Sequence, residues 1–204
     1  RISFTGGPNA ARHVIGNSTH NFAEVSLELG GKSPIIVFED ADIDSAVNGA
    51  AGGIFGASGQ SCVAGSRLLL HEAIADQFIE KMRAIATGVK IGDPMLEQTE
   101  MGPLCTFGQL ETIERELAHA KTEGATVICG GQRAKAGSDM FFQPTIVACP
   151  SPDLRIVDTE LFGPVVTVLR FKDEADAIRL ANRSDNRNPD PEHYYLLSLD
   201  SHLS

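Results

Sequence analysis

Two residues of this 204-residue sequence are of types that can act together as a nucleophile and a base, Cys62 and Glu28. Cys62 follows Gly59-Gln60-Ser61 and is not part of an apolar stripe, although a lone cysteine is more often an inert, buried residue. A thiolate is the reactive form of cysteine, and flanking glycines allow the Cys62 amide to donate to an oxyanion. Glu28 lies thirty-four residues earlier, after an apolar segment and before two glycines. By itself this position favours a surface carboxylate at a strand end over a buried general base.

An α/β fold with a mostly parallel sheet is expected to position these residues, because short apolar runs alternate with longer helical periodicities. We expect strands near residues 1–4, 25–29, 34–38, 66–71, 125–129, 143–148 and 165–171. We expect helices near residues 10–18, 73–87, 106–123 and 174–182, and one more after Asp40 or Asp42. The clearest period places Leu110, Ile113 and Leu117 on one helix face, together with Ala120.

Composition excludes several classes of function. The formal net charge of −10 argues against nucleic acid or an anionic membrane as partner, and no apolar run approaches membrane-spanning length. The four cysteines form no C-x-x-C pair and have no histidine at zinc-ligand spacing, so we expect no metal site. Without a signal peptide the thiols are expected to be reduced and the protein cytoplasmic.

Four segments, in order, resemble signatures of the aldehyde dehydrogenase superfamily. Residues 27–34 (LELGGKSP) are similar to its glutamate signature, and residues 55–67 (FGASGQSCVAGSR) are similar to its cysteine signature. Residues 4–7 (FTGG) resemble the turn that faces the nicotinamide and diphosphate, and residues 160–165 (ELFGPV) resemble a later cofactor-binding motif. The resemblance covers nearly everything from residue 4 to residue 182.

The resemblance implies the oxidation of a small-molecule aldehyde to a carboxylic acid. Cys62 would attack the aldehyde to form a thiohemiacetal, hydride would pass to NAD or NADP, and a thioester would remain. Glu28 would then act as the general base that activates water. Members that pass the acyl group to coenzyme A generally lack this glutamate, so its presence favours hydrolysis. Lys32 is expected to be structural.

The resemblance also implies a set of cofactor-binding residues. Glu160 would hydrogen-bond the ribose hydroxyls, and Phe162 would lie near the nicotinamide. The residues expected to line the cofactor side from the earlier motifs are Thr5, Gly6, Gly7 and Leu29.

The expected domain organisation is that of a portion of a longer chain. Residues 1–29 would be the last elements of a Rossmann-like nucleotide-binding domain, and residues 30–182 would form the catalytic domain. Residues 183–204 are polar and broken by prolines, and we interpret them as a truncated, frameshifted or disordered tail. The full-length protein is expected to be a homo-oligomer, and the 204 residues alone are expected to show little or no turnover.

Two alternatives remain open at this point. The chain can be a catalytically incompetent piece that acts only in folding or assembly, or a cysteine-dependent esterase that acylates and deacylates Cys62 without hydride transfer.

Overall fold

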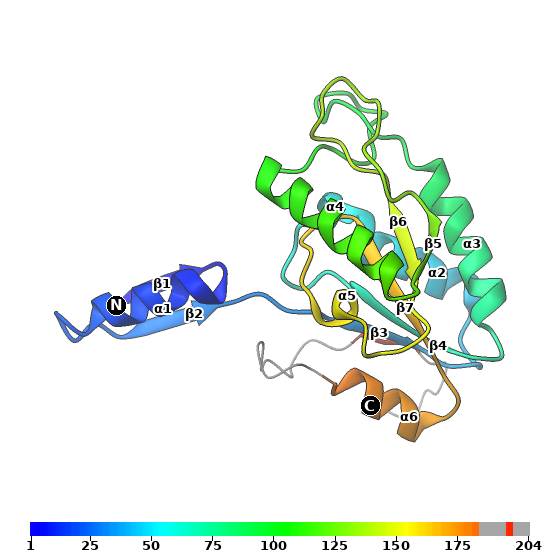
Figure 1. The fold of residues 1–204 in the computed structure, drawn as a ribbon, viewed down its shortest axis with the longest axis horizontal. Coiled ribbons are helices and arrows are strands. Elements are labelled where there is room, and N and C mark those ends of the chain that lie inside the picture. Colours follow the sequence, from blue (N-terminus) through cyan, green and yellow to red (C-terminus); the bar gives the residue numbers. More distant parts are fainter. Residues whose placement is uncertain (184–194, 198–204) are drawn as a thin grey trace. The chain divides into compact units, whose positions relative to one another are not determined.

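The structure, a computed structural model, describes residues 1–183 and 195–197 (Figure 1). The chain forms two compact units, Arg1–Gly31 and Lys32–Ser204. No helix in the described part of the chain is long and apolar enough to span a membrane.

The first unit is a small βαβ arrangement. Strand β1 (Ile2–Thr5) pairs in parallel with β2 (Val25–Glu28), and helix α1 (Pro8–Ser18) connects them. Pro8 stands at the first position of α1, where its missing N–H costs nothing. These elements confirm the predicted strand, helix and strand at the start of the chain.

The second unit is built on a six-stranded sheet in the order β5-β6-β7-β4-β3-β8. All neighbouring strands are parallel except β5 and β6, which confirms the predicted mostly parallel sheet. The strands are β3 (Pro34–Val37), β4 (Arg67–His71), β5 (Thr126–Cys129), β6 (Thr145–Ala148), β7 (Val165–Phe171) and β8 (Tyr195–Leu197).

Helices and turns cover the two faces of this sheet (Figure 1). They are α2 (Ile43–Phe55), the 3₁₀ turn η1 (Gly56–Gly59), α3 (Ala75–Gly88), α4 (Phe107–Thr122), α5 (Arg155–Asp158) and α6 (Glu174–Ala181). Successive residues of β3 point to opposite faces: Ile35 packs with α2 and α3, whereas Ile36 packs with α4, α5 and α6. Both faces are therefore buried, which accounts for the continuous apolar run in β3.

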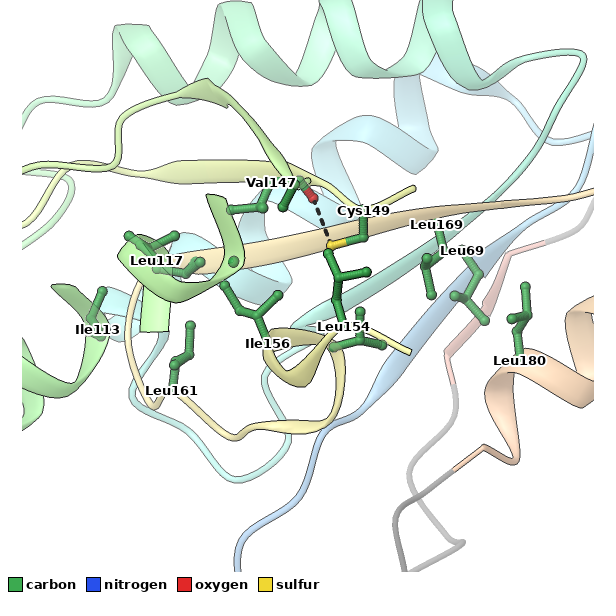
Figure 2. Packing of buried hydrophobic residues seen from close by; sticks show 14 of the residues in the cluster. Leu69, Ile113, Leu117, Val147, Cys149, Leu154, Ile156, Leu161, Leu169 and Leu180 are labelled. Atoms are coloured by element: carbon green, nitrogen blue, oxygen red, sulfur yellow. Dashed lines mark hydrogen bonds between the residues drawn. The ribbon is translucent and has the colours of Figure 1, made fainter. Parts of the chain in front are cut away.

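The core beneath α4 has the composition that the sequence predicted. Leu110, Ile113, Leu117 and Ala120 are all buried, and Figure 2 shows Ile113 and Leu117 packing in one cluster with Leu161. The thiol of Cys149 lies within the same cluster and donates to the Val147 carbonyl (Figure 2).

Side-chain caps set the start of three helices. Asp42 accepts from the Ser45 amide at 2.8 Å and caps α2, which decides between the two aspartates proposed from the sequence. Thr106 caps α4 and Asp173 caps α6 in the same way. The short elements α5 and η1 were not predicted.

Three residues of the segment interpreted as a truncated, frameshifted or disordered tail form a strand, and that interpretation stays a prediction. Tyr195–Leu197 forms β8, which pairs in parallel with β3. The sequence Tyr-Leu-Leu suits a strand, and the free edge of β3 provides backbone partners, although the polar surroundings concealed this short run. Residues 184–194 and 198–204, on which the rest of that interpretation falls, lie outside the described residues.

A buried guanidinium joins the sheet to α6. Arg67, at the start of β4, is 4% exposed and donates to the carbonyl oxygens of Lys32, Leu180, Ala181 and Arg183 at 2.7 to 3.2 Å. Leu180 and Ala181 are the last two residues of α6 and Arg183 follows just beyond it, so three of these carbonyls lie where helical partners run out and the helix dipole favours a cation.

We expect the substitution Arg67→Lys to lower the free energy of unfolding by about 3 kcal/mol, because a lysine cannot satisfy several fixed carbonyls at once. Urea-induced unfolding measures the effect. The matched control is Arg83→Lys, whose guanidinium pairs with the exposed Glu80 and whose replacement should change stability by less than about 0.5 kcal/mol. Equal effects of the two substitutions would contradict this role for Arg67.

Candidate active site

Cys62 lies at the second position of a β-turn between η1 and β4. The Ala64 amide donates to the Ser61 carbonyl at 3.1 Å and closes the turn, and the Val63 amide donates to Ser61 Oγ at 3.4 Å. The Cys62 thiol is exposed. Within residues 1–183 and 195–197, no group accepts a hydrogen bond from the Cys62 amide. Both the thiol and the amide are thus available to a ligand. A reactive Cys62 whose amide donates to an oxyanion requires this.

The backbone just before this turn is strained. Ala57, Ser58 and Gly59 have φ angles of 48°, 56° and 68°, in the left-handed region. For Ala57 and Ser58 this conformation costs roughly 1 kcal/mol or more each, because Cβ approaches the backbone. The Gln60 amide donates to the Ala57 carbonyl at 3.1 Å and closes this left-handed turn.

Two side-chain hydrogen bonds hold the strained turn against the segment that precedes α4. Ser58 Oγ donates to the Gly102 carbonyl at 2.9 Å, and Gln60 Oε1 accepts from the Cys105 amide at 2.9 Å. Ser58 is buried. The turn is therefore fixed by contacts some 45 residues away in sequence.

The backbone of Gly59 lies directly against Gly163. A Cβ atom on Gly59 would meet the Gly163 carbonyl oxygen at 2.1 Å and the Pro164 nitrogen at 2.8 Å, so no side chain fits there. This contact packs the Cys62 segment against the segment that carries Glu160 and Phe162. Two of the four motifs singled out in the sequence are thereby brought together.

Beyond the cysteine, the turn is anchored to α2 and to the sheet. The Gly65 amide donates to the Gly53 carbonyl of α2 at 3.1 Å, and the Arg67 amide donates to the Ser33 carbonyl at 3.1 Å. A Cβ atom on Gly65 would lie 2.2 Å from Ile35 Cδ1, so a side chain there would have to displace the buried end of Ile35. Cys62 is held from both sides.

Glu160 is half-buried, and Phe162 is 39% exposed with a left-handed φ of 49°. An aromatic residue in this conformation is uncommon, and it is stabilised here by its packed neighbours. The amide nitrogen of the Gln109 side chain donates to the carbonyl oxygen of Leu161, between these two residues. The segment thus presents a carboxylate and an aromatic ring near the Cys62 turn.

A buried lysine lies beneath this segment. Burial of the Lys32 ammonium group and repulsion from the nearby guanidinium of Arg67 together lower its pKa to about 8. The negative charges of the Glu160 and Asp158 carboxylates act in the opposite direction. The ammonium nitrogen has no hydrogen-bond partner among the described residues. Lys32 is thus part of the interior beside Glu160, in agreement with the structural role expected of it.

The remaining predicted residues meet at the end of the two-stranded sheet. Thr5 of β1 is directly opposite Glu28 of β2, and the Gly6 amide donates to the Glu28 carbonyl at 3.0 Å. Gly7 and Leu29 are the next residues on each side. The Glu28 side chain is exposed, as expected of a surface carboxylate at the end of a strand. The predicted site residues fall into two sets, one on each unit.

Sequence reasoning missed the residues that support Cys62, namely Ser58, Gln60 and the segment from Gly102 to Cys105. Gln60 was visible as a polar neighbour of the nucleophile, but its partner is a backbone amide, which no sequence pattern reveals.

No group of three or more His, Cys, Asp or Glu side chains that could hold a metal occurs in the described part of the chain.

Comparison with known proteins adds independent findings. Residues 1–188 match the model of the "Aldehyde dehydrogenase family". The chain is 50% identical over 182 residues to (Z)-2-((N-methylformamido)methylene)-5-hydroxybutyrolactone dehydrogenase of Acinetobacter baylyi, covering 89% of this chain and 37% of that protein. It is 40% identical over 186 residues to the chloroplastic betaine aldehyde dehydrogenase of Atriplex hortensis, covering 91% of this chain and 37% of the relative. The chain thus spans about 37% of the length of the curated relatives it matches.

A solved structure has a similar fold. The betaine aldehyde dehydrogenase of Staphylococcus aureus, crystallised in complex with NAD+, superposes with a TM-score of 0.85 at 40% identity. The match covers 90% of this chain and 37% of that one.

We expect Gly59→Ala to lower the free energy of unfolding by about 3 kcal/mol, since the added methyl group meets backbone atoms and the φ of 68° disfavours any side chain. Gly56→Ala is the control, because a Cβ atom there meets nothing within 4 Å and should change stability by less than about 1 kcal/mol. Denaturant unfolding of both variants tests this. A Gly59→Ala protein as stable as Gly56→Ala would refute the close backbone contact.

The lowered pKa of Lys32 predicts that the free energy of unfolding rises with pH. Its pKa is about 8 in the folded state against 10.5 for an unperturbed lysine, so the unfolded chain binds more protons between these values. The cost of burying the charge is present in full below pH 8 and is relieved as the pH rises towards 10.5.

The wild type should therefore gain up to about 3 kcal/mol relative to Lys32→Met across this window. Urea unfolding of both proteins at several pH values provides the comparison. A constant difference between the two would contradict the burial of the charge.

Proposed function

The chain belongs to the aldehyde dehydrogenase family, and on this basis we propose that the whole protein oxidises an aldehyde to a carboxylic acid, with NAD or NADP as hydride acceptor. The observation that carries the proposal is the contact of Gly59 with Gly163, since it packs the candidate nucleophile's turn against the segment of Glu160 and Phe162. A nucleophile near a group suited to hold a nicotinamide is the arrangement that this reaction needs.

Cys62 is the proposed nucleophile. Its thiolate sulfur bonds to the aldehyde carbonyl carbon, and the carbonyl oxygen becomes an oxyanion. The Cys62 amide, which has no partner in the described part of the chain, donates to that oxygen. The left-handed turn before Cys62 and the anchored Gly65 after it keep the sulfur and the amide in a fixed relation.

Glu28 is the proposed base for release of the acid. It takes a proton from water as the water oxygen attacks the thioester carbon; the C–S bond then breaks and the Cys62 thiolate leaves. Glu28 suits this role because it is an exposed carboxylate at the end of β2, within reach of solvent. Hydrolysis, and not transfer to coenzyme A, is thus the proposed outcome.

The residues of the second unit fit a nicotinamide ribose. A half-buried carboxylate such as Glu160 can accept hydrogen bonds from two adjacent hydroxyls, and the exposed ring of Phe162 offers a flat apolar surface. On the first unit we propose that Thr5, Gly6, Gly7 and Leu29 complete the cofactor side. A nicotinamide cofactor held by these residues would supply the hydride acceptor that the conversion of the thiohemiacetal to the thioester requires.

Homo-oligomerisation of the whole protein and a cytoplasmic location stay predictions. The chloroplastic location in the name of the Atriplex hortensis relative belongs to that protein.

Cys62→Ala and Glu28→Gln test the mechanism when each is compared with the wild type in two assays. The first follows NADH formation from an aldehyde and NAD. The second follows acylation of Cys62 by p-nitrophenyl acetate, detected by mass spectrometry, and does not depend on the cofactor. We expect Cys62→Ala to abolish both reactions, and Glu28→Gln to leave acylation intact while slowing deacylation at least about 100-fold.

The outcomes also separate the alternatives. Ester hydrolysis at Cys62 in the whole protein, without any aldehyde-dependent NADH, would favour the cysteine-dependent esterase. Absence of both reactions in a folded wild-type chain would favour a piece that acts only in assembly. Reaction rates that are unchanged in Cys62→Ala would refute Cys62 as the nucleophile.

A further inference from the structure

We propose that Gln60 is a positioning residue for Cys62: its side chain fixes the turn so that the Cys62 amide stays directed at the oxyanion. The inference rests on the proposed function, in which that amide stabilises the charge formed when Cys62 attacks a carbonyl carbon. Gln60 touches neither substrate nor cofactor in this proposal and acts through the backbone of the turn.

The first argument is the strain next to Gln60. Three successive residues, from Ala57 to Gly59, have left-handed backbone angles, and two of them carry side chains. Such a turn persists only where surrounding contacts fix it, and strain of this kind concentrates where a side chain must be presented in one orientation. Gln60 is the residue at which the chain leaves the strained turn and enters the turn of Cys62.

The second argument is the partner of the Gln60 side chain. Gln60 Oε1 accepts from the Cys105 amide at 2.9 Å, and the next residue, Thr106, caps α4 by accepting from the Gln109 amide at 3.2 Å. The Gln109 side chain in turn donates to the Leu161 carbonyl, next to Glu160. Gln60 therefore connects the Cys62 turn to the start of α4, and through α4 to the candidate cofactor-binding segment.

The third argument is the geometry of the turn itself. Ser58 and Gly59 hold its first half through Gly102 and Gly163. The Ser61 hydroxyl accepts from the Val63 amide within the turn of Cys62, whereas the Gln60 side chain ties the residue two positions before Cys62 to a distant segment, at Cys105. Without this acceptor the residues from Gln60 to Cys62 can rotate while the strained turn stays in place. The expected consequence is a misdirected Cys62 amide in an otherwise folded protein.

Two reactions of the Cys62 thiol distinguish a misdirected Cys62 amide from a general loss of thiol reactivity. In acylation by p-nitrophenyl acetate, the Cys62 thiolate bonds to the carbonyl carbon, an oxyanion forms, and p-nitrophenolate leaves. In alkylation by iodoacetamide, the thiolate displaces iodide from a saturated carbon and no oxyanion forms. Both reactions need the thiolate, so a changed thiol pKa affects them alike, and only acylation depends on the amide.

The experiment compares the full 204-residue wild type with Gln60→Met, which keeps the length of the side chain and removes its acceptor, and Gln60→Glu, which keeps an acceptor. Gln132→Met is the matched control, because Gln132 is exposed and distant in sequence from the turn. Mass spectrometry of the Cys62 peptide gives both rates. Continued protection of Cys149, which is 9% exposed, verifies that each variant is folded.

We expect Gln60→Met to lower the acylation rate about tenfold or more while alkylation changes less than about twofold. Gln60→Glu should restore the ratio of the two rates to within about threefold of the wild type, and Gln132→Met should match the wild type. Parallel loss of both reactions in Gln60→Met, or no change in either, would overturn the positioning role alone. A wild type whose Cys62 is alkylated but never acylated would overturn the proposed function, and the inference with it.

Discussion

The absence of a side chain at Gly59 is the constraint on which the candidate site depends. Strands β4 and β7 are parallel neighbours with Arg67 opposite Thr167, so the segments that enter these strands reach the same edge of the sheet. One of these segments carries Cys62 and the other carries Glu160. They can close on each other only because the Gly59 backbone lies against the backbone of Gly163. The nucleophile and the candidate ribose-binding carboxylate are thus assembled at the amino ends of two strands, whereas open parallel sheets usually bind ligands at the carboxyl ends.

Holding this edge together costs free energy, and the structure offsets the cost with polar contacts. Left-handed angles at Ala57, Ser58 and Phe162 are each unfavourable. The Ser58 hydroxyl and the Gln60 side chain fix the first turn, and Gln109 holds the segment that contains Phe162. Arg67 adds a second level of support, because it joins the start of β4 to the end of α6. Contacts along one edge of the sheet therefore offset the strain in the turn.

The sequence predicted the elements whose signals are local. Capping residues and a period of 3.6 located α2, α4 and α6, and continuous apolar runs located the strands covered on both faces. It did not predict α5 or η1, because elements of four residues have no measurable period. For the site, the residue types and spacing pointed to Cys62, whereas Glu28 and Glu160 became candidates through the resemblance of their segments to aldehyde dehydrogenase motifs. The glycines near Cys62 were expected to let backbone amides approach the reacting centre, yet Gly59 is needed for a backbone contact within the protein, which only the three-dimensional arrangement reveals.

Lys32 shows why a residue in a motif of catalytic candidates need not take part in the chemistry. Two cations, Lys32 and Arg67, lie close together in the interior, and their repulsion adds to the cost of desolvation. The negative charges of Glu160 and Asp158 reduce this cost, so the charge on Lys32 is stabilised by the segment that we propose for cofactor binding. Because electrostatic attraction is mutual, Lys32 also attracts the Glu160 carboxylate from the interior side. Lys32, in residues 27–34, thus supports the segment of Glu160 from the interior. The polar surface that a cofactor would contact is provided by Glu160.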